Sequence, residues 1–340
     1  MRKFFLSVLV SSLLILSTFG CTPKSDNNDS LALLLLGAGA SANSSSEDLS
    51  CQNKTLNWTI RTPAEANTWL AVKFGDNRFV AIATNGTTPA MVSADGITWT
   101  GHTPPTGGSF TTLAHGNGMF VTTSPSVFTT KVMSSPDGVT WTNRTSPTPN
   151  WQSITFGNGT FVAVANNTTE RAMTSPDGIT WTGRTPPEDT WSHVGYGNGL
   201  FVALATSGKV ITSPDGIAWT PRSDVQANQW NSIAYGNGLF VAVNSNGANR
   251  VMTSPDGITW TPRTATEQNS WLSVTYGNGL FVAIAQDGTN RIMTSTDGIT
   301  WKAQTAPEQI LWRSITFGKN TFVAVSANAP SSKVMTASCD

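Results

Sequence analysis

A unit of about 41 residues repeats seven times along the chain. It reads W-x-S-[VI]-x-[YF]-G-N-G-x-F-V-A-[VI], then a variable stretch, then [KR]-x-M-T-S-P-D-G-I-T-W-T-x-R-T. Its opening aromatic residue recurs every 39 to 41 residues, at Trp69, Phe110, Trp151, Trp191, Trp230, Trp271 and Trp312. A second aromatic position is held by Trp58, Trp99, Trp141, Trp181, Trp219, Trp260 and Trp301. These two positions account for all 13 tryptophans, so we interpret tryptophan as scaffold, and the fixed period indicates a repeat architecture.

Each unit contains four short runs with strand character, separated by turn signals. In the sixth unit they cover residues 271–276, 280–285, 291–295 and 299–304. The G-N-G and D-G sequences between them suit tight hairpins, because glycine and asparagine adopt a positive φ at little cost. Four antiparallel strands in about 41 residues form one propeller blade. The sequence therefore predicts an all-β fold, a seven-bladed β-propeller over residues 51–340.

The two ends of the repeat array predict how the ring closes. The last unit stops after its third strand, at residues 333–337, and lacks a fourth. The missing strand is found at the other end, where residues 56–62 match the fourth-strand pattern of residues 258–264. We expect this N-terminal strand to complete the last blade. Cys51 and Cys339 then fall in one turn region, and we predict a disulfide between them, which export permits.

The first 50 residues have a different composition. Arg2 and Lys3 precede an apolar run, the layout of a secretory signal over residues 1–20, and this run is too short to span a bilayer. The sequence before Cys21 resembles the lipobox of bacterial lipoproteins, although Thr18 and Phe19 depart from the preferred residues. The resemblance implies an acylated, palmitate-bearing Cys21; a plain signal peptide cleaved nearby is the alternative. Residues 21–50 then form a disordered tether rich in Ser, Asn and Gly, apart from an apolar stretch at 31–40.

The balanced charge of the chain and its expected export restrict which molecules it can bind. The chain has 20 basic and 20 acidic residues, a balance that argues against a nucleic-acid-binding protein. We expect an exported monomer of the cell envelope, an outer-membrane lipoprotein that contacts the membrane only through its lipid; whether it faces the periplasm or the cell surface stays open. Three Cys and three His are too few for a metal framework, so we expect neither metal nor cofactor.

One motif resembles a known family. S-x-D-G-x-[TA]-W begins at Ser93, Ser135, Ser175, Ser213, Ser254 and Ser295. It is similar to the Asp-box, or BNR repeat, of sialidases and many non-enzymatic propellers, but it is one residue shorter than the family pattern S-x-D-x-G-x-T-W. The residues themselves favour a structural role, because such a carboxylate can accept hydrogen bonds from the N–H groups of its own turn.

The sialidase resemblance also implies an arginine triad, a Tyr–Glu nucleophile pair and an Asp acid/base. Tyr196, Tyr235 and Tyr276, however, share a repeat position at which other units have Phe. Arginine likewise recurs at one repeat position, and no unrepeated pair of acids appears, although a retaining glycosidase needs two. We therefore expect no enzyme, with a sialidase-like glycoside hydrolase as the alternative.

The variable stretches gather on one face of such a propeller, and variable loops on a rigid frame commonly carry recognition. Six cations begin the third strands on this face and could attract an anionic ligand: Lys131, Arg171, Lys209, Arg250, Arg291 and Lys333. Acids in the neighbouring loops, such as Glu188 and Asp189, could pair with them instead.

Residues that break the repeat are further candidates for a binding site. Phe128 and Leu311 are apolar where other units are polar, and Lys73 and His193 replace small residues on the innermost strand, near the channel. We predict a non-catalytic binding module for an unknown protein or glycan; a periplasmic assembly or structural factor is the other alternative.

Overall fold

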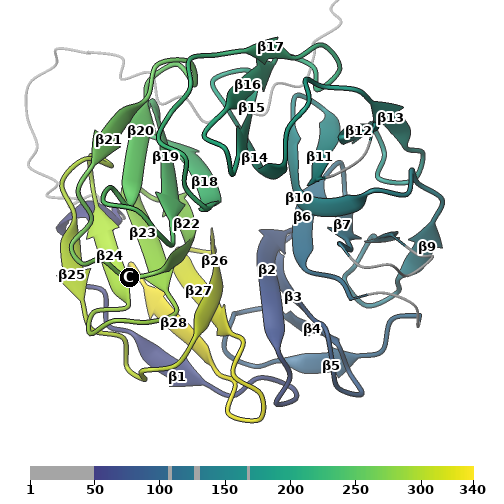
Figure 1. Ribbon diagram of the computed structural model, residues 1–340. Helices are drawn as coiled ribbons and strands as arrows, with labels where there is room; N and C mark the ends of the chain where they lie inside the picture. Colours follow the sequence, from purple (N-terminus) through teal and green to yellow (C-terminus); the bar gives the residue numbers. More distant parts are fainter. Residues whose placement is uncertain (1–49, 106–108, 126–130, 167–168) are drawn as a thin grey trace, which may run out of the picture. The chain divides into compact units, whose positions relative to one another are not determined.

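The computed structural model describes residues 50–340 except 106–108, 126–130 and 167–168. Over this part the chain forms seven sheets of four antiparallel strands, arranged around a common axis (Figure 1). The seven-bladed β-propeller is thereby confirmed. Two predicted site residues, Cys21 and Phe128, lie outside the described residues. Within the described part, no helix has the length and apolar character that crossing a membrane requires.

The strands of each blade follow one another from the axis outward. The innermost strands are β2 (Trp69–Gly75), β6 (Thr112–Gly116), β10 (Asn150–Gly157), β14 (Trp191–Gly197), β18 (Trp230–Gly236), β22 (Trp271–Gly277) and β26 (Trp312–Gly318). The second strands are β3 (Arg78–Ala83), β7 (Met119–Thr123), β11 (Thr160–Asn166), β15 (Leu200–Ala205), β19 (Leu239–Asn244), β23 (Leu280–Ala285) and β27 (Thr321–Ser326).

The outer half of each blade repeats in the same way. The third strands are β4 (Ala90–Ser93), β8 (Val132–Ser135), β12 (Ala172–Ser175), β16 (Val210–Ser213), β20 (Val251–Ser254), β24 (Ile292–Ser295) and β28 (Val334–Ser338). The fourth strands are β5 (Thr100–His102), β9 (Thr142–Arg144), β13 (Thr182–Arg184), β17 (Thr220–Pro221), β21 (Thr261–Arg263), β25 (Lys302–Gln304) and β1 (Thr59–Arg61). The first blade comprises β2 to β5, and the seventh comprises β26 to β28 with β1.

Burial explains the composition of these strands. The second strand reads F-V-A and is buried almost throughout, because neighbouring blades cover both of its faces. The fourth strand is the outer edge of its blade and is mostly exposed. Proline is tolerated there, at Pro221 and Pro262, because an edge strand can lack one N–H donor.

Neighbouring blades interlock through an aromatic ring and a glycine. The last residue of each innermost strand is glycine, and the aromatic ring of the next blade lies directly over it. A Cβ atom added to Gly157 would lie 2.0 Å from the ring of Tyr196, and the same contact closes the ring of blades between Gly318 and Phe74, at 2.1 Å. Any side chain larger than hydrogen would therefore push two blades apart.

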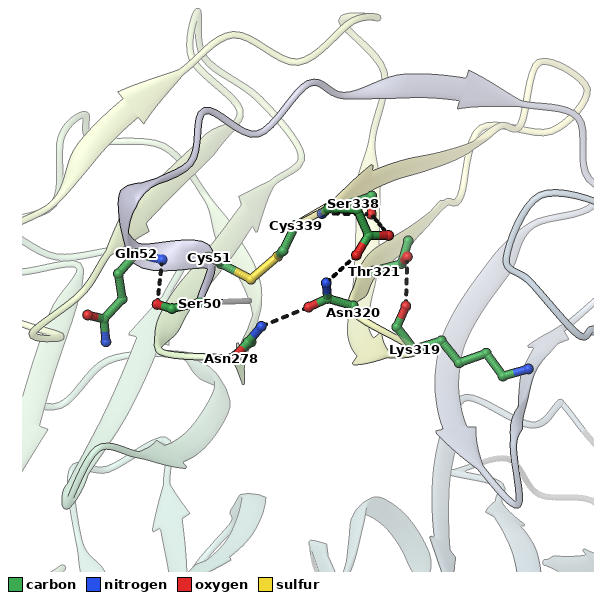
Figure 2. The surroundings of a disulfide bond; sticks show 10 residues. Ser50, Cys51, Gln52, Asn278, Lys319, Asn320, Thr321, Ser338 and Cys339 are labelled. Carbon is green, nitrogen blue, oxygen red and sulfur yellow. Dashed lines mark hydrogen bonds between the residues drawn. A yellow bond between two sulfur atoms is a disulfide. The ribbon is translucent and has the colours of Figure 1, made fainter. Parts of the chain in front are cut away.

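The N-terminal strand closes the propeller, as the cut ends of the repeat predict. β1 pairs with β28, with Thr59 opposite Thr336 and Arg61 opposite Val334, although they lie at opposite ends of the chain (Figure 1). Cys51, in the 3-10 turn η1 (Cys51–Asn53), forms a disulfide with Cys339, and their Cα atoms are 5.0 Å apart (Figure 2). The closing blade thus carries a covalent bond in addition to its strand pairing.

The propeller has two unlike faces. We call the side with the hairpin between first and second strands and the S-x-D-G turns the turn face. Asn117, in the first kind of turn, donates to the carbonyl of Pro176, in the second kind, at 2.8 Å. We call the opposite side, with the interblade loops and the loops between second and third strands, the loop face. Glu65 of an interblade loop accepts there from the N–H of Thr88 at 2.7 Å.

Candidate functional site

In all six S-x-D-G turns the aspartate accepts the same three hydrogen bonds from its own turn. In the fifth blade, Asp256 Oδ1 accepts from the N–H groups of Ile258 and Thr259, both at 2.8 Å, and from the hydroxyl of Ser254 at 2.9 Å. The N–H of Gly257, at φ 72°, donates to the same Ser254 hydroxyl at 2.8 Å. One carboxylate oxygen is thus used three times within its own turn.

These bonds lower the pKa of the carboxylates. The N–H of Thr259 contributes most to the lowered pKa of Asp256, with that of Ile258 also lowering it, while burial acts in the opposite direction. A carboxyl held as a stable anion by its own backbone is poorly suited to act as a general acid near neutral pH. The turns are structural units that present repeated, exposed Ile or Val side chains, such as Ile217 at 50% exposure.

The six predicted cations of the loop face begin their third strands, two strands out from the axis. Arg171 forms an ion pair with Glu188 at 2.9 Å, and Lys209 with Asp189 at 3.1 Å. For these two cations the structure agrees with the alternative prediction, in which acids of the neighbouring loops pair with the loop-face cations. Lys131 is nearly buried, at 6% exposure, and burial lowers its pKa.

The other members of the ring are half-buried. Arg250 Nε donates to Gln268 Oε1 at 3.0 Å, and Arg291 Nε to the carbonyl of Gly288 at 3.2 Å, while Lys333 donates its backbone N–H to Ser326. Two of the six charges are thus paired with loop acids, and two more donate to neutral groups of nearby loops. Leu311 is half-buried, and its N–H donates to Asn328 Oδ1.

A cavity of about 720 Å³ follows the propeller axis, and the innermost strands line it. It reaches the loop face, where Pro125, Thr206 and Gln229 contribute to its wall. At its other end it reaches the aromatic layer with Tyr235 and Tyr276. Its volume falls within the roughly 300–1,000 Å³ typical of small-molecule sites.

The wall of this cavity contains basic side chains and, in the described part of the chain, no carboxylate. Lys73 of β2, His193 of β14 and Arg313 of β26 all line it, whereas none of its lining residues in the described part of the chain is Asp or Glu. Neither Lys73 Nζ nor the Arg313 guanidinium has a hydrogen-bond or ion-pair partner among the described residues. Two unpaired cations therefore line the same cavity.

A β-bulge directs Arg313 into the cavity. In β26, Trp312 pairs with Ser326 and Ser314 with Val325, so that Arg313 is left out of the strand register. The bulge recurs in most innermost strands; in β10 it falls between Trp151 and Ser153. A bulge commonly re-aims a side chain, and here it places the residue after the opening aromatic at the mouth of the cavity on the loop face.

His193 replaces a residue that joins blades elsewhere. In the third blade the hydroxyl of Ser153, at the same repeat position, accepts from the N–H of Val194 in the next blade at 3.2 Å. In the fourth blade His193 stands there instead, and its Nδ1 atom is buried with no hydrogen-bond partner in the described structure. Burial and the nearby positive charge of Arg313 lower the pKa of His193 to about 4, although the carbonyl of Trp230 acts the other way.

Lys73 and Arg313 come from adjacent blades. The strands that carry them are joined by a hydrogen bond from the N–H of Val72 to the hydroxyl of Ser314, at 3.1 Å. The Lys73 side chain is exposed to the cavity, yet protein surrounds that space, and the resulting desolvation lowers its pKa. The same cause lowers the pKa of Arg313.

The three tyrosines behave as one structural class. Each packs against the phenylalanine of its own second strand with ring centroids 4.6 to 4.7 Å apart, as Tyr276 does with Phe281. Tyrosine and phenylalanine are thus interchangeable here, as the repeat indicates. The described residues contain no group of three His, Cys, Asp or Glu side chains that could hold a metal ion.

Sequence reasoning identified Lys73 and His193 but missed Arg313. A signal was present, because the repeat position of Arg313 holds Leu70, Thr111, Gln152, Ser192, Asn231 and Leu272 in the other units, all of them uncharged. That position alternates with core positions, so its direction toward the axis was not evident without the bulge.

Comparisons with known proteins give the fold. No protein-family model matches the chain, and no curated protein matches it in sequence. Among solved structures it is similar to YCF48 bound to a D1 peptide, with 16% identity over 83% of this chain and 97% of that chain, at a TM-score of 0.64. It is also similar to a catalytically inactive virginiamycin B lyase from Staphylococcus aureus with quinupristin, with 11% identity over 83% of this chain and 99% of that chain, at a TM-score of 0.71.

A third similar structure is the WD40 domain of Neurospora crassa Pan2, with 11% identity over 83% of this chain and 96% of that chain, at a TM-score of 0.60. These neighbours are propellers of several kinds, and they do not single out the Asp-box family. At such low identity the likeness concerns the architecture, and it leaves the ligand of this chain to be argued from its own residues.

Proposed function

We propose that this protein is a non-catalytic binding module of the bacterial cell envelope, anchored by a lipid on Cys21, which recognises a protein or glycan with its loop face. The observation that carries the proposal is a difference in side chains between the two faces of the propeller. The repeated carboxylates of the turn face are occupied by their own backbone, whereas the side chains that differ between blades lie on the loop face and the cavity wall.

The position of the N-terminal segment supports the choice of face. The N–H of Cys51 donates to the carbonyl of Asn278, in a hairpin turn of the turn face, at 3.0 Å. The chain therefore enters the propeller at the turn face, and a tether from the membrane would leave the loop face free for a partner. Propellers similar to this one include a peptide-bound protein and a lyase, so the fold alone accommodates both binding and catalysis.

The absence of acids from the described cavity wall argues against a glycosidase, which requires carboxylates at its reacting bond. A sialoside turnover assay tests this directly. Turnover that a single Asp or Glu substitution abolishes would establish the hydrolase alternative and overturn our proposal.

Blocking each face separately tests the binding role. We would introduce Thr289→Cys on the loop face or Thr300→Cys on the turn face; both threonines are exposed and both belong to the sixth blade. In a chain with Cys21→Ser, a maleimide-linked polyethylene glycol would label the introduced thiol, because Cys51 and Cys339 are joined. Glycan arrays and a panel of purified envelope and host-surface proteins would then be probed with each conjugate.

We expect the label at position 289 to lower binding at least tenfold and the label at position 300 to leave it unchanged. Loss of binding from the turn-face label alone would reverse the assignment of faces. An absence of binding to every glycan and protein would favour the assembly or structural role instead.

A further inference from the structure

The central cavity contains more positive charge than any group on its wall can balance. Arg313 and Lys73 are unpaired in the described structure, and both lose hydration because protein surrounds the cavity. Holding two like charges on the wall of one cavity is unfavourable unless an anion joins them. The third group, His193, lies close enough to Arg313 for the guanidinium to lower its pKa, so the three groups act on one volume.

We propose that this cavity binds a phosphate group, either free phosphate or the monoester of a small polyhydroxylated compound such as a sugar phosphate. Charge matching selects phosphate over carboxylate. A phosphate monoester carries about −1.5 to −2 at neutral pH and offers three acceptor oxygens, which suits one guanidinium, one ammonium and an imidazole that takes up a proton from solvent when the dianion binds beside it. A monoanionic carboxylate would leave one cation unpaired.

The rest of the wall supports a polyhydroxylated ligand. Gln152, Ser192 and Asn231 occupy the repeat position of Arg313 in other blades, and all three line the cavity. Hydroxyl and amide groups donate to and accept from sugar hydroxyls, and none of these side chains is charged. The cavity reaches the loop face, so a phosphate can enter from the side on which we place recognition.

The repeat supplies substitutions that should preserve the fold. Lys73→Thr installs the residue that other blades have as Thr155 and Thr275, His193→Ser installs that of Ser153, and Arg313→Asn that of Asn231. Lys302→Thr is the matched control: it removes one exposed cation outside the cavity and installs the residue found at Thr261.

Titration calorimetry of the full mature protein at constant ionic strength provides the test. The probes are inorganic phosphate, glucose 6-phosphate, glucuronate, glucose and an acidic peptide. We expect both phosphates to bind, glucose 6-phosphate more tightly, and glucuronate at least tenfold more weakly. The triple variant K73T/H193S/R313N should lose phosphate binding, each single variant should weaken it about tenfold, and K302T should not change it.

Proton uptake gives a second, independent readout. At pH 6, titrations in buffers of different ionisation enthalpy should show that phosphate binding takes up a proton, and H193S should reduce this uptake. Arg313 is the charged group that acts on His193, and the other ionisable side chains on the cavity wall are Lys73, Tyr196, Tyr235 and Tyr276; β10 and β18 on either side of β14 place no charged residue there.

Several results would overturn the proposal. They are the absence of phosphate binding, equal binding by the triple variant, or binding of glucuronate or the acidic peptide as tight as that of glucose 6-phosphate. The proposal rests on the binding role above, but the two can fail separately. A loop-face partner whose binding is unaffected by the triple variant, with no phosphate binding, removes only the phosphate site. Phosphate binding without any macromolecular partner removes only the larger recognition role.

Discussion

The turn face and the central cavity are built by the same repeat, yet they differ in whether their charged side chains have partners. At the turn face each repeated aspartate has its own donors, as Asp256 has Ile258 and Thr259. At the cavity, Lys73 and Arg313 occur once each and have no partner among the described residues. The charge of each repeated turn is satisfied within that turn, whereas a charge that occurs once in the ring depends on what its neighbours or a ligand provide.

The covalent closure should have the largest effect on the shared scaffold. Replacing Cys51 and Cys339 by Ser removes a link that spans 288 residues, and we expect the free energy of unfolding to fall by on the order of 5 kcal/mol. Denaturant titration of the double variant measures this loss, with Cys21→Ser as the control that should leave stability unchanged. An unchanged midpoint in the double variant would show that strand β1 closes the ring without help.

The blade interface should be the next most sensitive part. Gly157→Ala places a Cβ atom 2.0 Å from the ring of Tyr196, and we expect a loss of about 3 kcal/mol from overpacking. Gly183→Ala on the outer strand is the control, because its closest neighbour is the flexible end of Glu170. Equal thermal denaturation midpoints for the two variants would contradict the interlocking role of the inner glycines.

Because of His193, the free energy of unfolding should fall in acid. Its pKa is about 4 in the folded protein against 6.5 ordinarily, so between these values the unfolded chain binds a proton that the folded chain does not. Stability is therefore full above pH 6.5 and falls by about 2–3 kcal/mol as the pH drops to 4, in the absence of ligand. H193S should flatten this part of the pH profile of unfolding; parallel profiles for the two proteins would refute the assignment.

A single turn should contribute least, because the scaffold has six of them. Asp256→Ala removes three hydrogen bonds, and we expect a loss of about 1–2 kcal/mol at neutral pH. Because the pKa of Asp256 is lowered, this contribution is present above its ordinary value of 3.8 and disappears as the pH falls below it. Asp224→Ala, at an exposed position, is the control, and equal chemical denaturation curves would show that the turn bonds add nothing.

Much of the fold could be predicted from the sequence because the unit is written seven times. Averaging over the copies separates strands from turns, and the cut ends at residues 56–62 and 333–337 reveal how the ring closes. The pairing of Thr59 with Thr336 confirms that closure, and the disulfide between Cys51 and Cys339 agrees with it.

The candidate site was less predictable. The six loop-face cations share a repeat position, but their partners lie in loops whose conformations the sequence does not specify. The structure pairs Arg171 with Glu188 and Lys209 with Asp189. From the sequence, this pairing was only the alternative to a ring of free cations that binds an anion.

By itself the sequence determined the blade, the number of blades and the closing strand, because these follow from local periodicity and turn chemistry. Only the tertiary structure decided which of the residues that break the repeat lie close together. Lys73, His193 and Arg313 belong to the first, fourth and seventh blades, and they line one cavity because the ring closes and a bulge re-aims one of them. Electrostatic interaction depends on distance through space and on the surrounding dielectric, and neither is set until the blades have closed around their axis.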